Sequence, residues 1–411
     1  MSLPPPTPVA DALRSILGSA AAPADIESVP LRRAAGRTLA RDLAALRTQP
    51  PRAVSAMDGY AVRAVDIAIA PATLDLVGES AAGRGFDGVV GPGQAARIFT
   101  GAPVPEGADT VLIQENAAAE PGHLRALQSE PQGRNIRRAG QDFSAGEVLL
   151  SAGLRLGAAD IALAAAMNHP ALPVFRRPRV AVLATGDELV LPGEEPGPDR
   201  IVASNGFALM ALAESAGAEP IDLGIVGDDF ASLRAAFARA RDGGADLLVT
   251  LGGASVGDHD LVQRTLVAEG MTLGFWRVAM RPGKPLFHGR LGTMQVLGLP
   301  GNPVSAIVCG LLFVSPLIRA LSGDRHAGDD PSEAAVLAIP MAANDGRQDY
   351  VRARIIASAD GVPHVEPGPR QDSSLLKALS DADCLVIRPP HAAAADTGTP
   401  CRIIRLARLG A

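Results

Sequence analysis

The sequence predicts a multidomain chain of mixed α/β and β class. A doubly wound parallel-sheet domain is joined to a β-rich domain, a connecting element and a C-terminal β-barrel-like domain. The first observation is length: 411 residues allow several cores at about one domain per 150 residues. Residues 178–325 alternate strand and helix patterns, which predicts a parallel sheet with right-handed crossovers. The flanking regions show short β-like runs instead.

The N-terminal half is predicted to contain two units. Residues 1–45 and 147–177 are expected to pack together as a connecting helical region, because 27–45 and 147–177 are rich in Ala and Leu and the second contains the helix-like run LGAADIALAAAMNH. Residues 46–146 are expected to form the β-rich domain, since Gly and Pro punctuate runs such as QAARIFTG and DTVLIQE.

The doubly wound domain is expected over residues 178–325. RVAVLATG is an unbroken apolar run that ends in Gly, as in a strand buried on both faces. Ser204 and Asn205 offer an N-cap for the helix that Gly217 ends. ADLLVTLGG predicts another buried strand, and an apolar helix runs from Asn302 to about Leu321. Residues 326–411 alternate in AAVLAIPMAA and DYVRARIIAS, which predicts a small β domain or barrel.

Composition excludes several classes of protein. A net charge of -6 and 3% aromatic residues argue against a nucleic-acid-binding protein. The three cysteines are too scattered for a disulfide framework or a zinc site. No apolar run is expected to approach the roughly 20 residues of a membrane helix, and no basic segment precedes an apolar one at the start. We therefore expect a cytoplasmic protein without a membrane partner.

Two Gly-rich turns follow buried strands of the doubly wound domain. In TLGGASVGDHD (250–260), Gly252, Gly253 and Gly257 allow backbone N–H groups to approach an anion, and a helix N-terminus follows. A tight turn that binds nothing is about equally common for such a pattern. In GLPGNPVSA, Asn302 is placed as an N-cap with Pro303 at the first helical position. The absence of GxxxxGK[ST] and GxGxxG disfavours a P-loop or a dinucleotide site.

A third turn adds carboxylates at the same edge of the sheet. Asp187 and Glu188 in ATGDEL directly follow a buried strand, where a carboxylate could hold Mg²⁺ or orient water. A solvated loop acid is the commoner fate of one such residue, but three converging turns favour a site. RPGKPLF adds Arg281 and Lys284, a pair that suits a tetrahedral oxyanion or an ordinary basic loop.

Other polar segments lie outside this domain. SAMDGYAV contains Asp58, and FTGAPVPEGADTVL contains Thr100. NIRRAGQDF adds Arg137 and Asp142. Composition alone assigns these residues to turns and surface pairs, because exposed charges usually pair with little energetic consequence.

Taken together, SAMDGYAVRA, IFTGAPVPEGADTV, NIRRAGQD, VAVLATGDELV, SNGFAL, VTLGGASVGDHD, RPGKPLFHG and GLPGNPVSA resemble, in this order, the molybdopterin molybdenumtransferase family, which includes the E region of gephyrin. The resemblance spans roughly residues 27–322 and is specific as a set. It implies four regions per subunit and an elongated homodimer. It also implies molybdenum insertion into adenylyl-molybdopterin, with Mg²⁺-assisted hydrolysis of the phosphoanhydride to give molybdenum cofactor and AMP. Molybdate is then a substrate, and molybdopterin adenylyltransferase and molybdoenzyme apoproteins are expected partners.

The resemblance also implies roles for individual residues. Candidates for handling metal, water or molybdate are Asp58, Thr100, Asp142, Glu188, Asp228 and Asp260, with Glu188 and Asp58 as metal ligands. The phosphate cradle comprises Gly252, Gly253, Ser255 and Gly257. Phosphate or molybdate would be neutralised by Arg137, Arg277, Arg281 and Lys284, and further substrate contacts would come from Pro300, Asn302 and Ser373.

Some positions depart from the family pattern. Arg277 and Arg281 stand where relatives often have lysine, which keeps the charge and changes the geometry. In the C-terminal region, Arg347, Arg352 and Ser373 match the family only loosely.

Three alternatives stay open. A molybdopterin adenylyltransferase needs only the doubly wound domain, so the length of the chain argues against it. A non-catalytic dimeric scaffold of the gephyrin type is disfavoured by the carboxylates Asp58, Glu188 and Asp260. Tungstate matches molybdate in charge and nearly in size, so the sequence does not distinguish the two oxyanions.

Overall fold

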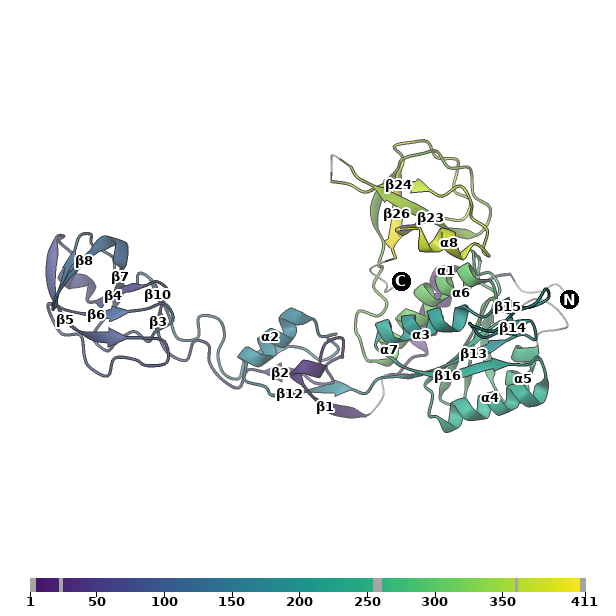
Figure 1. The fold of residues 1–411 in the computed structure, drawn as a ribbon, viewed down its shortest axis with the longest axis horizontal. Coiled ribbons are helices and arrows are strands. Elements are labelled where there is room, and N and C mark those ends of the chain that lie inside the picture. The colour runs from purple at the N-terminus through teal and green to yellow at the C-terminus, as the bar shows by residue number, and fades with distance from the viewer. Residues whose placement is uncertain (1–4, 22–24, 254–260, 359–360, 407–411) are drawn as a thin grey trace.

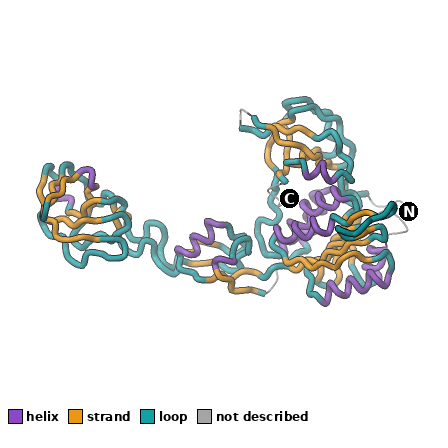
Figure 2. Tube along the Cα trace, viewed as in Figure 1, coloured by secondary structure: helices purple, strands orange, loops and turns teal. Residues whose placement is uncertain are grey.

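The computed structural model describes residues 5–21, 25–253, 261–358 and 361–406, and these form an elongated molecule (Figure 1). A β-rich domain lies at one end of the long axis, a small connecting module follows, and an α/β domain with a C-terminal barrel forms the other end (Figure 2). The fold class predicted from the sequence is confirmed.

The β-rich domain is built on a six-stranded sheet with the order β7-β4-β6-β5-β9-β8. Its strands are β4 (Gly59–Val62), β5 (Ala72–Ser80), β6 (Gln94–Ile98), β7 (Thr110–Ile113), β8 (Ala117–Glu120) and β9 (His123–Ala126). A separate pair joins β3 (Val54–Ser55) to β10 (Ile136–Arg137). Short 3-10 turns lie at Ala64–Ile67 and Gln114–Asn116. Tyr60, Leu74, Leu112 and Leu124 are buried in the core of the sheet.

The connecting module is made from two stretches of chain that run in opposite directions. Strand β1 (Ile26–Pro30) pairs antiparallel with β12 (Ala171–Phe175), and β2 (Leu43–Ala44) pairs with β11 (Val148–Leu150). Helix α2 (Ala158–Ala166) and a 3-10 turn at Leu31–Arg33 complete it. The chain passes through this module on its way to the β-rich domain and again on its way back. The module therefore lies between the β-rich domain and the α/β domain and separates them (Figure 1).

The first helix does not belong to the connecting module. Helix α1 (Val9–Gly18) buries Ala12 and Ile16 in the core of the α/β domain and contacts helix α7 there. Thr7 forms a parallel bridge with Val278 of the same domain. The prediction that 1–45 as a whole forms part of the connecting region is therefore corrected for this segment. The apolar face of this segment indicates a helix, but it does not indicate which domain the helix packs against.

The α/β domain has a six-stranded sheet with the order β16-β13-β17-β21-β20-β18. The first four strands are parallel, β20 runs antiparallel to β21, and β18 runs antiparallel to β20 and so returns to the direction of the first four. The strands are β13 (Arg179–Thr185), β16 (Glu219–Val226), β17 (Leu247–Leu251), β18 (Thr272–Trp276), β20 (Phe287–Leu291) and β21 (Met294–Leu299). The short strands β14 (Leu189–Val190) and β15 (Ile201–Val202) pair beside the sheet.

Helices cover both faces of this sheet. One face packs α3 (Asn205–Ala216) and the final helical segments, and the other packs α4 (Phe230–Asp242) and α5 (Leu261–Ala268). Side chains of β13 alternate between them: Val180 and Val182 face the first group, whereas Ala181 and Leu183 face the second. This is the doubly wound arrangement that the unbroken apolar strands predicted.

The final helical stretch corrects one expectation. Helix α6 (Pro303–Cys309), a π-helical turn (Gly310–Val314) and α7 (Ser315–Leu321) form a continuous helix of 19 residues, and an 18-residue window within it has a mean hydropathy of 2.1. An apolar run of nearly the length of a membrane helix is therefore present, contrary to expectation. However, 83% of that window is buried inside the protein, as in the core helix of a globular domain.

The C-terminal region forms a closed barrel. Its strands are β22 (Glu333–Leu337), β23 (Gln348–Ile356), β24 (His364–Pro367), β25 (Cys384–Arg388) and β26 (Pro400–Arg405). They pair in the order β23-β24-β22-β26-β25, and β25 returns to pair with β23. Strand β19 (Met280–Arg281) adds to β23, and helix α8 (Leu376–Ser380) lies beside the barrel (Figure 1). The β-barrel-like architecture predicted for the C-terminal region is confirmed.

Candidate functional site

A cavity of about 820 Å³ lies at the carboxyl edge of the parallel strands in the α/β domain. Neighbouring strands β13 and β17 send their connections in opposite directions, and open α/β sheets bind ligands at such switch points. The polar residues and glycines in its lining are Thr185, Gly186, Glu188, Ser204, Asn205, Gly206, Asp228, Gly252, Gly253, Gly301, Asn302 and Ser374. We call this space the sheet-edge cavity.

The turn after β17 brings backbone close to the neighbouring strand. Gly252 and Gly253 have φ values of 93° and 63°, in the region that glycine adopts at no steric cost. A Cβ at Gly252 would lie 2.8 Å from the carbonyl oxygen of Thr185. The Gly252 N–H donates to the carbonyl of Leu299, 3.2 Å away, so it is already used within the fold. Ser255, Gly257 and Asp260, the other predicted members of this turn, lie outside the described residues.

Carboxylates gather on the β13 side of the cavity. Glu188 and Asp228 line it, and the Asp228 N–H donates to Asp187 Oδ1 over 3.3 Å. The pKa of Asp228 is raised, first by partial burial and then by the negative charges of Asp187 and Glu188. The Glu188 carboxylate folds over Gly186, where a Cβ would come within 2.5 Å of it. Mutual repulsion of this kind is relieved by a cation, and hard carboxylate oxygens suit Mg²⁺.

These acids do not form a complete metal cage. Among the residues that the structure describes, no group of three or more His, Cys, Asp or Glu side chains is arranged to hold a metal ion. Protein sites for Mg²⁺ commonly supply one or two carboxylates and take the remaining oxygens from water and substrate phosphates. Glu188 and Asp228 fit that partial role.

The turn after β21 connects the cavity to the barrel. Asn302 occupies the predicted N-cap position of α6, but its side chain makes no capping hydrogen bond. Its Nδ2 instead donates to Ser373 Oγ at 3.0 Å, and the Val304 N–H donates to the carbonyl of Ser373 at 3.1 Å. Pro300 also lines the cavity. The structure therefore brings Pro300, Asn302 and Ser373 together, although 71 positions separate the last two.

Asn205 is a polar lining residue that the sequence analysis treated only as part of a helix cap. Its Nδ2 donates to the carbonyl of Gly301 over 2.7 Å, which ties the start of α3 to the turn after β21. Ser204 holds the N-cap position of α3 without a side-chain capping bond. The sequence signal that could have identified Asn205 as a lining residue was its place in the SNGFAL motif, which follows the carboxylate turn in the chain.

The predicted cations lie in different places. Lys284 is exposed and precedes Pro285, which lines the sheet-edge cavity. Arg277 is buried with φ 71°, and its guanidinium lies 5.1 Å from the Trp276 ring centroid. The lining of the cavity contains neither Arg277 nor Arg281.

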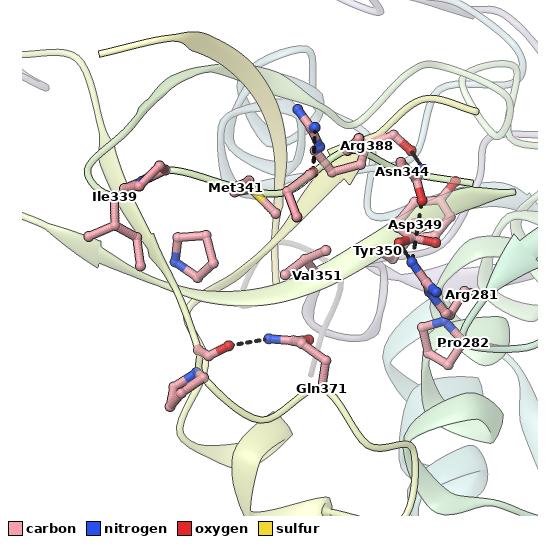
Figure 3. A pocket seen from close by; sticks show the side chains of 16 residues that line it. Arg281, Pro282, Ile339, Met341, Asn344, Asp349, Tyr350, Val351, Gln371 and Arg388 are labelled. Atoms are coloured by element: carbon pink, nitrogen blue, oxygen red, sulfur yellow. Dashed lines mark hydrogen bonds and ion pairs between the residues drawn. The ribbon is translucent and has the colours of Figure 1, made fainter. Parts of the chain in front are cut away.

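Arg281 faces a second cavity, of about 610 Å³, between the α/β domain and the barrel (Figure 3). It forms an ion pair with Asp349, and its Nη2 donates to Asn344 Oδ1 at 3.3 Å. Arg352 is buried in the barrel and donates to the carbonyls of Arg370 and Asp372, so it holds the loop that leads to Ser373. Arg347 pairs with Asp345, whose pKa falls to about 2 through the hydrogen bonds from Arg347.

A second group of predicted site residues lies in the β-rich domain. Thr100 donates two hydrogen bonds to Asp58 Oδ1, from its N–H at 2.7 Å and from its hydroxyl at 2.8 Å. These bonds lower the pKa of Asp58. Arg137 is exposed on β10, opposite Val54. Asp142 is exposed where the chain returns to the connecting module.

The two groups of residues lie at opposite ends of the elongated molecule. The β-rich domain with Asp58 is at one end of the long axis, and the sheet-edge cavity with Glu188 is at the other, beyond the connecting module (Figure 1). The long axis lies in the plane of that view, so the separation is not an effect of projection. One chain therefore does not bring Asp58 and Glu188 to the same site.

Comparison with known proteins finds family matches in three regions of the chain. Residues 7–168 match the MoeA N-terminal region (domain I and II), 181–320 match a probable molybdopterin binding domain, and 334–406 match the MoeA C-terminal region (domain IV). A molybdopterin molybdenumtransferase of Nostoc sp. is 38% identical over 89% of this chain and 85% of its own. The Haemophilus influenzae protein of the same name is 36% identical over 89% and 90%.

A solved structure has the same overall arrangement. The molybdopterin biosynthesis MoeA protein of Pyrococcus horikoshii superposes with a TM-score of 0.84 and 28% identity, over 97% of this chain and 99% of that one. The likeness therefore includes all four regions.

Proposed function

The chain belongs to the molybdopterin molybdenumtransferase family, and from that premise we propose that it inserts molybdenum into adenylyl-molybdopterin, the last step of molybdenum cofactor assembly. The sheet-edge cavity is the observation that carries this proposal. It combines a Gly-lined turn with the carboxylates Glu188 and Asp228 at the switch point of a doubly wound sheet. Molybdate is the second substrate, and the products are molybdenum cofactor and AMP.

The residues of the cavity suit hydrolysis of a phosphoanhydride. The Gly253 turn and Asn302 lie where phosphate oxygens can approach backbone and amide donors. Glu188 and Asp228 would hold Mg²⁺, which neutralises charge on the anhydride when it is bound. Lys284, which precedes the lining residue Pro285, would balance charge that develops as the leaving phosphate departs.

The remaining candidates would enter from a second chain. Asp58, Thr100, Arg137 and Asp142 lie in or beside the β-rich domain, at the far end of the elongated molecule (Figure 1). In a homodimer, the β-rich domain of one subunit can cover the sheet-edge cavity of the other. A two-fold dimer then contains two equivalent sites, each with Asp58 and Glu188 from different chains.

The proposal also defines the neighbouring reactions. An adenylyltransferase must supply the adenylylated pterin, and molybdoenzyme apoproteins must take the finished cofactor. We assign these reactions and this protein to the cytoplasm. Tungstate remains a competing oxyanion, because it has the same charge and nearly the same size as molybdate.

The test is a release assay with purified protein, adenylyl-molybdopterin and Mg²⁺. AMP and metal-loaded pterin are measured with molybdate, with tungstate and with neither oxyanion. The proposal predicts that both products rise with molybdate. If the protein adenylylates molybdopterin from ATP without molybdate, it is an adenylyltransferase. If neither reaction occurs, the scaffold alternative replaces the proposal.

A further inference from the structure

Arg97 lies at the centre of a group of contacts that surrounds Asp58. It is on β6, directly opposite Tyr60 on β4, and two positions before Phe99. Its guanidinium carbon is 4.9 Å from the ring centroid of Tyr60 and 4.9 Å from that of Phe99. A guanidinium that lies over two aromatic rings is attracted to both, and this restricts its rotation.

Arg97 is also hydrogen bonded beside the Asp58 backbone. Its Nη2 donates to Gln114 Oε1 at 2.8 Å, and its Nη1 donates to the carbonyl of Gly59 at 3.3 Å. The Gln114 N–H in turn donates to the carbonyl of Asp58 at 3.2 Å. Arg97 therefore contacts Gly59, which follows Asp58 in the chain, and Gln114, which is hydrogen bonded to the Asp58 carbonyl.

The Arg97 side chain also contacts the residue next to Thr100, the hydrogen-bond partner of Asp58. Phe99, which packs against the guanidinium, directly precedes Thr100. Thr100 places its N–H and its hydroxyl on one oxygen of Asp58, so a small movement of either loop breaks both bonds. Asp58 and Thr100 are 42 positions apart, and Arg97 contacts residues adjacent to each.

We infer that Arg97 is a positioning residue, which fixes the Asp58–Thr100 pair in the geometry that the reaction needs. The inference rests on the proposed function, in which Asp58 works at the shared site. Arg97 acts on the pair through its neighbours, because its Nη1 and Nη2 donate to Gly59 and Gln114 and its guanidinium packs on Phe99. Reacting groups held about 1 Å out of place lose roughly a hundredfold in rate, so such a residue affects kcat.

The test uses Arg97→Met, which keeps an unbranched apolar side chain at this position but removes the charge and the donors. Arg97→Lys restores the charge without the planar fork. Arg125→Met, at an exposed arginine on β9 of the same sheet, is the matched control. Hydrogen–deuterium exchange at the Thr100 amide, measured without substrate, reports the bond to Asp58 directly. Steady-state AMP release gives kcat and KM.

We expect the Thr100 amide of Arg97→Met to exchange about tenfold faster and kcat to fall roughly 10- to 100-fold. KM for adenylyl-molybdopterin and the thermal midpoint should stay near wild type, Arg97→Lys should recover part of kcat, and Arg125→Met should change neither quantity. Wild-type exchange at Thr100, or an equal loss in Arg125→Met, overturns the inference. If the wild-type protein releases no AMP yet Arg97→Met loosens Thr100, only the proposed function fails.

Discussion

Arg281 is ion-paired with Asp349 across the boundary between the α/β domain and the barrel (Figure 3). The two residues are register partners, because β19 adds to β23 at this point. Only 9% of the Asp349 side chain is exposed, whereas Arg281 is half exposed. The arginine therefore neutralises a carboxylate that water does not reach well, and it holds the barrel to the α/β domain.

Arg281→Met should destabilise the protein by about 1–3 kcal/mol, because it leaves the buried Asp349 without its charged partner. Adding Asp349→Asn should recover most of that loss, since the carboxylate that needs a cation is then gone. Urea unfolding followed by the fluorescence of Trp276, the single tryptophan of the chain, measures both variants. Additive losses would contradict the pairing.

The same double variant separates two roles of Arg281. If this side chain mainly joins the domains, the restabilised double variant should keep AMP release within about threefold of wild type. A loss of roughly a hundredfold in a stable double variant would place Arg281 on the substrate instead, as the family resemblance implies.

Glu188→Gln should fold normally and lose AMP release. Glu188 is exposed beside the sheet-edge cavity, so its substitution should change the free energy of unfolding by less than about 0.5 kcal/mol. Loss of a carboxylate that holds metal or orients water should lower kcat on the order of a hundredfold.

The matched control for Glu188→Gln is Glu195→Gln. Glu195 is exposed in the loop that follows β14 and is not part of the cavity lining. It should retain wild-type kcat. Equal activity of both variants, or unfolding of Glu188→Gln alone, would reassign Glu188 to a structural role.

His288 should make the stability of the α/β domain depend on pH. Burial lowers the pKa of this side chain, whose Nε2 is 2.9 Å from Gln295 Oε1. A depressed pKa means that the fold favours the neutral ring. The stabilisation that the neutral His288 ring contributes is therefore complete above 6.5, the ordinary pKa of histidine. It is lost as the pH falls below 6.5 towards the lower pKa of the folded state.

His288→Phe removes the titrating group and keeps a ring against Phe275, whose centroid is 5.7 Å from that of His288. The variant should be less stable at pH 7.5, because it loses the bond to Gln295. Between pH 6.5 and 5, however, it should lose less stability than wild type. Unfolding followed by Trp276 emission at each pH measures this difference, and parallel curves would contradict the assignment.

The sequence predicts the elements better than it predicts their contacts. The apolar run Leu247–Leu251 is sufficient to identify β17, because a strand buried on both faces has few polar positions. The cap position of Asn302 is likewise a local property. The bond from Asn302 to Ser373 joins two domains and depends on how the barrel docks, which no local pattern encodes.

The candidate site shows the same limit. Glu188 and Asp228 follow strands of one sheet, so topology alone places them at one edge. The bonds of Thr100 to Asp58 depend on the pairing of the neighbouring strands β4 and β6, whose register places Gly59 opposite Ile98. The partner of Arg281 depends on the pairing of β19 with the barrel, so a cation expected beside phosphate was found beside Asp349.

The most direct measurement concerns the shared site. Asp58→Ala and Glu188→Ala are each expected to be inactive and to keep the dimer. In a mixed dimer, both substitutions fall in one site and the other site is intact. Random pairing of equal amounts makes about half of the dimers mixed, so about a quarter of all sites should regain AMP release. No recovery in dimers shown to be mixed would contradict the account, because each site would then take both residues from one chain.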